Sequence, residues 1–268
     1  MSNSVKFITV FFFVALCYSC SSIPDFPEGG YKYPASPFKG TKDSFNSSLY
    51  SHYWSLAFNE LELNVAPLKQ VTIRLIYETA FGESVTLIMT QKEIVIKQAI
   101  QGSPYPNYEI DKLDSLERFH LQILRSNFPI EEIKPDNPTK KRMDSLAGIY
   151  PKLLDPNYYK YLLDKSTNFD SIPFKYKTTK VPITNSKFHT LLEEINASGY
   201  WKLPPRVKCD SDGYLDGFGF MLEANTPQKY NFVSLSNCPE KALEFSKACQ
   251  AIIDAANLSK RIRVIPEN

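Results

Sequence analysis

Three short segments between residues 70 and 96 alternate apolar with polar side chains, and this pattern constrains the fold more than any other feature of the chain. Alternation with a period of two is typical of strands that bury one face. Short turn sequences separate the three segments, so we expect an antiparallel β-meander. The apolar positions are Val71, Ile73, Leu75 and Tyr77, then Val85, Leu87 and Met89, then Ile94 and Ile96.

The rest of the chain adds strands and amphipathic helices. Further strands are expected near 173–182 and in a hairpin around the turn at 224–228, and helices at 113–124, 188–195 and 239–257. Asp114 and Glu117 suit a helix start, and Gly199 suits a helix end. Hairpins with helices inserted between them predict an α+β fold, in which a mostly antiparallel sheet is packed by amphipathic helices on one face.

Two regions are harder to assign. Residues 49–65 combine a helical pattern with an alternating one. Residues 130–170 are polar and contain several prolines, with short helices expected near 140–147 and 156–165. We expect one α+β domain with an irregular helical insertion near 130–170. The predicted boundaries are 46–260 for the domain and 261–268 for a tail.

The N-terminus has the features of an export signal. Residues 7–19 form an apolar or weakly polar run of 13 residues, whereas a membrane-spanning helix needs about 20. Residues 1–19 are therefore predicted to be a signal peptide. The sequence that follows resembles a bacterial lipobox, in which a small residue precedes a cysteine that becomes lipid-modified. Cys20 fits because Ser19 precedes it, whereas Cys17 follows a leucine.

The predicted lipidation site places the protein at a membrane. Residues 20–45 are rich in Pro, Gly and Ser, and we expect them to form a flexible tether that begins at the acylated Cys20. The protein is then exported and anchored in the cell envelope of a diderm bacterium, on the periplasmic or the surface side. The alternative is an ordinary cleaved signal that leaves a soluble secreted protein without lipid.

Three cysteines remain after the predicted signal and lipidation site: Cys209, Cys238 and Cys249. Cys238 precedes Pro239, a good first residue for a helix, and Cys249 would lie about 16 Å further along that helix. A disulfide requires Cα atoms within about 7 Å, which excludes Cys238–Cys249. We predict Cys209–Cys238, because these two cysteines flank the predicted hairpin at comparable distances from its turn, with Cys209–Cys249 as the alternative. Cys249 is then a buried free thiol.

Candidate metal-ligating residues are confined to one acidic segment. Asp210, Asp212 and Asp216 are weak candidates for calcium ligands, because the segment lacks the residues of an EF-hand loop. A polar loop whose aspartates and glycines form turns is the simpler interpretation. Glu223 could form a carboxylate pair with Asp212 or Asp216 that serves hydrolysis. We assign no catalytic residue, no metal and no cofactor.

Other function classes are restricted by charge and composition. Lys plus Arg is 31 and Asp plus Glu is 29, so the net charge of +2 argues against a nucleic-acid partner. The three histidines, His52, His120 and His189, have no spacing that suggests a triad or metal cluster. Aromatic residues make up 13% of the chain, which is compatible with a protein or glycan partner as well as with an aromatic core.

The C-terminal quarter carries a resemblance to a known family. In order, the chain has the helix from Phe188, Trp201-Lys202-Leu203-Pro204, Asp216-Gly217, Phe220, Leu222-Glu223, Tyr230, Cys238-Pro239 and a last helix to Ile253. This order resembles an uncharacterised family of exported bacterial proteins, many of them predicted lipoproteins. The resemblance implies a domain of unknown function and supplies no catalytic residues. We favour a binding or structural module, and the alternative is an envelope hydrolase using carboxylates near Asp210–Asp216 and Glu223.

Overall fold

The computed structural model is built around one antiparallel sheet. It describes residues 26–28, 30–31, 52–79, 84–104, 107–127, 138–168, 174–209, 217–236 and 238–265. The sheet strands are β1 (Thr72–Thr79), β2 (Ser84–Met89), β3 (Glu93–Gln101), β6 (Lys175–Pro182), β7 (Phe218–Asn225) and β8 (Tyr230–Ser236). Their spatial order is β6-β3-β2-β1-β7-β8, and every neighbouring pair is antiparallel.

The longer helices in the described residues are α3 (Ser115–Asn127), α4 (Pro138–Ile149), α5 (Pro156–Ser166), α6 (Asn185–Ala197) and α7 (Leu243–Ala255), and residues 52–57 are also helical. The predicted α+β class, with its antiparallel sheet and packed helices, is therefore confirmed, and so are the meander β1-β2-β3 and the hairpin β7-β8. Within the described ranges, no helix combines the length and the apolar character needed to cross a membrane.

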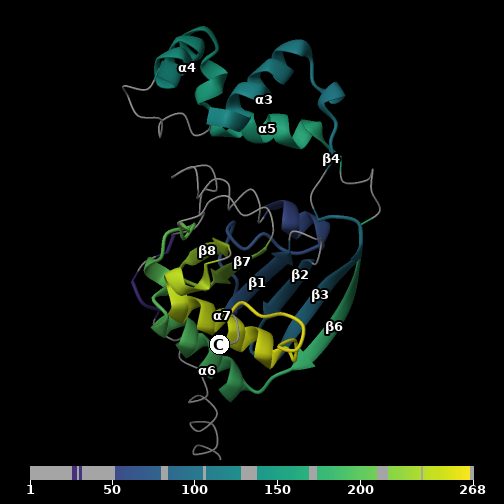
Figure 1. The fold of residues 1–268 in the computed structure, drawn as a ribbon, viewed down its shortest axis with the longest axis vertical. Helices are drawn as coiled ribbons and strands as arrows, with labels where there is room; N and C mark the ends of the chain where they lie inside the picture. The colour runs from purple at the N-terminus through teal and green to yellow at the C-terminus, as the bar shows by residue number, and fades with distance from the viewer. Residues whose placement is uncertain are drawn as a thin grey trace, which may run out of the picture.

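One face of the sheet carries the main apolar core. Helices α6 and α7 lie side by side across this face (Figure 1). Leu75 on β1 lies opposite Leu87 on β2 and Leu222 on β7, and all three are fully buried. Thr184 is the N-cap of helix α6, and its side chain accepts a hydrogen bond from Lys187 N. The helix ends before Gly199.

Gly199 has a φ of 77°, a left-handed conformation that glycine adopts without steric cost. The predicted stop of this helix is thus confirmed, because the chain turns there into a short 3-10 helix (Tyr200–Lys202).

The second face of the sheet is also buried, which the sequence pattern did not indicate. Helical residues 52–57 and the turns that follow cover it. Trp54 and Phe58 from this segment pack with Ile76 of β1, Met221 of β7 and Phe232 of β8. The ambiguous region is therefore helical in its described first part, and residues 61–65 form turns rather than the strand that their alternation suggested.

A helical insertion interrupts the connection between two neighbouring strands, β3 and β6. It contains α3, α4 and α5, and in Figure 1 it lies above the sheet. The short strands β4 (Asn107–Tyr108) and β5 (Thr167–Asn168) pair with each other, so the two ends of the insertion lie together. Its own apolar cluster contains Leu121, Leu124 and Leu162, and Tyr53 of the 52–57 segment packs into the same cluster.

Candidate functional site

The predicted disulfide between Cys209 and Cys238 is present. Residues 205–207 run beside β8, where Val207 N donates to Ser234 O and Ser234 N donates to Pro205 O. This pairing brings Cys209 beside the end of β8, and Cys238 follows that strand directly. The two Cα atoms are 5.8 Å apart, within the range that a disulfide requires.

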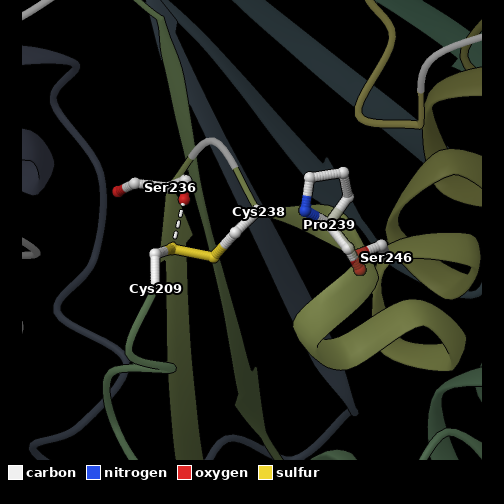
Figure 2. Close-up of a disulfide and its surroundings, with 5 residues drawn as sticks. All are labelled: Cys209, Ser236, Cys238, Pro239 and Ser246. Carbon is white, nitrogen blue, oxygen red and sulfur yellow. Dashed lines mark hydrogen bonds between the residues drawn. A yellow bond between two sulfur atoms is a disulfide. The ribbon is translucent and has the colours of Figure 1, made fainter. Parts of the chain in front are cut away.

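Pro239 follows Cys238 and is the first residue of the helical segment that leads to the last helix. It begins a 3-10 helix, Pro239–Ala242, that leads into α7. The Ser246 hydroxyl donates to Pro239 O at 3.0 Å, and both residues are drawn in Figure 2. The disulfide therefore joins the covered edge of the sheet to the start of the helix that packs on it.

Cys249 is a buried free thiol, as predicted. It lies on α7 within the main core and is fully buried. Burial raises the pKa of this thiol well above its ordinary value. Because the thiolate is the reactive form of cysteine, Cys249 is an inert core residue at neutral pH.

Glu223 belongs to a buried ion pair. The pairing of β1 with β7 places it directly opposite Arg74, and both side chains are almost completely excluded from solvent. Arg74 Nε donates to Glu223 Oε2 at 2.6 Å, and the Tyr230 hydroxyl donates to Oε1 at 2.6 Å. Arg74 also donates to the carbonyl oxygen of Leu61, at 3.1 Å.

This network accounts for the burial of Arg74 and Glu223 on the second face of the sheet. Phe220 and Leu222 lie in the main core, whereas the alternate position Met221 lies in the second cluster, so Glu223 faces the second cluster as its place on the strand implies. Burial, and then the neighbouring Glu223 carboxylate, raise the pKa of Tyr230 well above its ordinary value. Both carboxylate oxygens of Glu223 are bonded, one to Arg74 and the other to Tyr230, and the side chain is fully buried.

The other predicted acidic residues, Asp210, Asp212 and Asp216, lie outside the described residues, as does the predicted lipidation site Cys20. Among the residues that the structure does describe, no group of three or more His, Cys, Asp or Glu side chains is arranged to hold a metal ion. The calcium hypothesis and the pairing of these aspartates with Glu223 therefore remain sequence predictions.

The three histidines occupy separate places. His52 Nδ1 lies 2.5 Å from Glu62 Oε1, and this hydrogen bond lowers the pKa of Glu62. His120 on α3 is buried and bonded to the Tyr158 hydroxyl at 2.9 Å. His189 lies on α6, next to Phe188. They do not form a catalytic cluster.

A polar cluster on the insertion was not predicted as a unit. Asp114 and Glu117 form the expected capping box, in which Glu117 N donates to Asp114 Oδ1 and Asp114 N donates to Glu117 Oε2. The Glu117 carboxylate also accepts from Lys165 at 2.7 Å and from the Tyr161 hydroxyl at 3.0 Å. The Lys165 and backbone hydrogen bonds lower the pKa of Glu117.

The role of this cluster is structural. Glu117 lies in the first turn of α3, and Tyr161 and Lys165 lie one turn apart on α5. The Glu117 carboxylate therefore links the two helices. The capping-box sequence predicts only where the helix starts. The contact with α5 could not be predicted from it, because the partners are more than 40 positions away.

Comparisons with known proteins add no assignment. No protein-family profile matches the chain, and neither the curated proteins nor the solved structures include a significant match.

Proposed function

We propose that this protein is exported and held in a bacterial cell envelope by acyl chains on Cys20, and that it acts there as a binding or structural module. The single observation that supports export most directly is the disulfide Cys209–Cys238. Disulfides persist in oxidising compartments outside the cytoplasm and are rare within it. This agrees with the apolar run and the lipobox-like sequence at the N-terminus.

The mode of attachment follows from the same sequence. The apolar run of residues 7–19 is too short for a membrane span, so acyl chains on Cys20 supply the anchor. Each buried acyl CH₂ contributes about 0.8 kcal/mol, and more than one chain is needed for stable attachment. The resemblance to exported bacterial proteins of unknown function is in keeping with this proposal.

A non-enzymatic role is preferred to hydrolysis because of the state of Glu223. A catalytic carboxylate must reach its substrate, yet Glu223 is fully buried and bonded to Arg74 and Tyr230. No specific observation favours the hydrolase, and its remaining support is the aspartate-rich sequence before β7.

Metabolic labelling with radioactive palmitate tests the proposal. The native chain and Cys17→Ala should incorporate label, and Cys20→Ala should not, because Cys17 is the matched cysteine within the predicted signal. Label retained in Cys20→Ala, or an unmodified mature N-terminus beyond residue 20, would contradict the lipid anchor and favour a soluble secreted protein.

A further inference from the structure

Part of the predicted tether is seated on the folded sheet. Tyr31 N donates to Tyr230 O at 2.6 Å, and Tyr230 N donates to Tyr31 O at 2.9 Å. These two bonds form an antiparallel bridge on the edge strand β8, and Gly30 N donates to Trp201 O at 3.0 Å. The segment is the purple trace at the left of the sheet in Figure 1.

Side-chain contacts hold the same segment. Phe26 packs edge-to-face on Trp201, with ring centroids 5.5 Å apart, and Tyr31 stacks on Phe232 at 5.7 Å. The ammonium of Lys229 donates to the carbonyl oxygen of Pro27 and lies 4.2 Å from the Trp201 ring centroid. Backbone and aromatic contacts together show a built docking site for residues 26–28 and 30–31.

Gly30 is required for this close approach. Its φ of 75° is left-handed, and a Cβ added there would lie 2.9 Å from Tyr230 O and 3.1 Å from the Trp201 ring. A larger residue at this position therefore pushes the segment away from the Tyr230 carbonyl of β8 and from the Trp201 ring, which is buried in the main core. This provides a selective way to release the segment.

The docked segment limits how far the sheet can be from a lipid on Cys20. Six residue steps separate Cys20 from Phe26, and a fully extended chain spans at most about 22 Å over that length. A tether that ran freely to residue 46 would instead allow about 90 Å. The short connection from Cys20 ends at Phe26, and Phe26 packs on Trp201. This edge of the sheet must therefore remain close to the anchor.

The surface beside Trp201 has a charge that suits a membrane. Lys202, Arg206 and Lys208 are exposed along the segment that runs beside β8 toward Cys209. Anionic headgroups attract such basic residues within a Debye length of the bilayer. The insertion is carried by β3 and β6 at the other edge of the sheet, about 24 Å away across five strand spacings.

We propose that Lys202, Arg206 and Lys208, which lie on the segment that follows the buried Trp201, form a membrane-facing surface, which lies against the anionic headgroups of the bilayer that holds the acyl chains of Cys20. This inference rests on the proposed lipidation. The docked segment turns a long tether into a short one, so the sheet is held against the membrane by its β8 edge and the helical insertion is presented on the side away from that edge.

Fluorescence quenching in vesicles tests this orientation. The lipidated full chain is reconstituted into phosphatidylethanolamine–phosphatidylglycerol vesicles that contain a lipid with a nitroxide on its headgroup. The chain has two tryptophans, so Trp54→Phe reports on Trp201 and Trp201→Phe reports on Trp54. Trp54 bonds to Thr86 on β2, three strands in from β8, and should be quenched much less than Trp201.

A matched pair of glycine variants tests the docked segment itself. Gly30→Ala should greatly reduce the quenching of Trp201, whereas Gly148→Ala, whose added Cβ meets nothing within 4 Å, should leave it unchanged. The same comparison in the chain with both tryptophans keeps the test valid if Trp54→Phe does not fold. Equal quenching of both tryptophans, or no effect of Gly30→Ala, would overturn the orientation.

The lipid composition tests the basic residues. Replacing phosphatidylglycerol with phosphatidylcholine should reduce the quenching of Trp201, and the triple change Lys202→Gln, Arg206→Gln and Lys208→Gln should abolish this dependence. Quenching that is independent of lipid charge would overturn the electrostatic part. A native chain that fails to float with the vesicles would instead contradict the lipid anchor, so the two failures are distinguishable.

Discussion

The sheet and the helical insertion stabilise themselves in different ways. The sheet buries apolar side chains on both faces, encloses the ion pair of Arg74 with Glu223 and is joined to α7 by a disulfide. The insertion has a small apolar cluster, and its main ion pair, between Lys165 and Glu117, lies near the surface. Several of its large apolar side chains are exposed, including Leu116, Phe119 and Ile149.

The comparison shows where polar contacts determine stability. In the sheet, neighbouring strands hold both members of an ion pair opposite each other, and both are buried from solvent, so the loss of one partner is costly. In the insertion, water replaces a lost surface partner, and exposed pairs contribute little. The loss of an ion-pair partner should therefore lower the free energy of unfolding much more in the sheet than in the insertion.

The largest effect is expected from breaking the buried pair. Glu223→Leu leaves Arg74 charged and buried, which should lower the free energy of unfolding by about 3–5 kcal/mol. Urea denaturation followed by circular dichroism measures this. The matched variant in the insertion, Glu117→Gln, should have little effect on global unfolding.

A compensating variant distinguishes a buried charge from a general packing defect. Changing Arg74→Met and Tyr230→Phe together with Glu223→Leu removes the unpaired polar groups and should recover most of the lost stability. A single Glu223→Leu variant as stable as the native chain would contradict the burial of this pair.

Loss of the disulfide should be the next largest effect. The two cysteines are 29 residues apart, and the chain-entropy relation gives about 3–4 kcal/mol for a loop of that size. We expect Cys209→Ser with Cys238→Ser to destabilise the sheet and to leave hydrogen exchange in α3 and α5 nearly unchanged.

Thiol alkylation followed by intact mass checks the pairing directly. In the denatured, unreduced chain without the lipidation site, Cys249 should react, and Cys209 and Cys238 should react only after reduction. Three reactive thiols before reduction would contradict the pairing, and Cys249→Ala serves as the control that removes the single reactive thiol.

A matched pair of leucine substitutions should show whether the insertion unfolds independently. Leu162→Ala on α5 should cost about 2–3 kcal/mol, at the low end for a buried leucine because the small cluster can relax. Amide exchange should accelerate in the insertion and not in β1 or β7. Leu222→Ala on β7 should instead accelerate exchange throughout the sheet. Uniform acceleration by Leu162→Ala would show that the two regions unfold together.

The smallest effect concerns pH and should be confined to the insertion. Burial lowers the pKa of His120 below its ordinary value of 6.5. The unfolded chain then binds more protons than the folded chain as the pH falls below 6.5, so the insertion loses stability on acidification and keeps it above that value. Amide exchange in α3 and α5, compared at about pH 7.5 and 5.5 after correction for intrinsic rates, should reveal this dependence.

The His120→Gln variant should remove that pH dependence while the strands behave as in the native chain. Within the described residues, Nε2 of His120 is buried without a hydrogen-bond partner, which is consistent with a neutral ring. Exchange in the strands that changes as strongly as exchange in α3 would contradict a local effect.

Much of the fold follows from local patterns in the sequence. Alternation in the meander, the capping box at Asp114 and Glu117, and the glycine stop at Gly199 each depend on residues close in the chain, and each is confirmed. The pairing of Cys209 with Cys238 was predictable because a helix excluded one alternative and a hairpin brought the other pair together.

The polar positions of the strands show why the remainder was not predictable. Arg74 and Thr86 alternate with apolar residues and so resembled the solvent side of a half-buried sheet. Their partners are Glu223, which is 149 residues away from Arg74, and Trp54, which is 32 residues away from Thr86. No periodicity records such a pairing, because periodicity describes one element at a time.

The tether is a similar case. Its proline- and glycine-rich composition predicted free chain, yet residues 26–28 and 30–31 contact Trp201 and Tyr230, which lie about 170 to 200 positions later. Composition measures how little a segment can bury by itself, and it carries no information about an edge strand elsewhere that accepts the segment.

The amino-acid sequence alone determined the elements of the sheet and the pairing of the cysteines, because these depend on short-range chemistry or on simple distances along the chain. The proposed export signal and lipidation site rest on the sequence as well. Only the tertiary structure decided that both faces of the sheet are buried, that Glu223 is neutralised by Arg74, and that the N-terminal segment lies on β8. These features arise where distant residues exclude water together, and such contacts form only when the whole chain has folded.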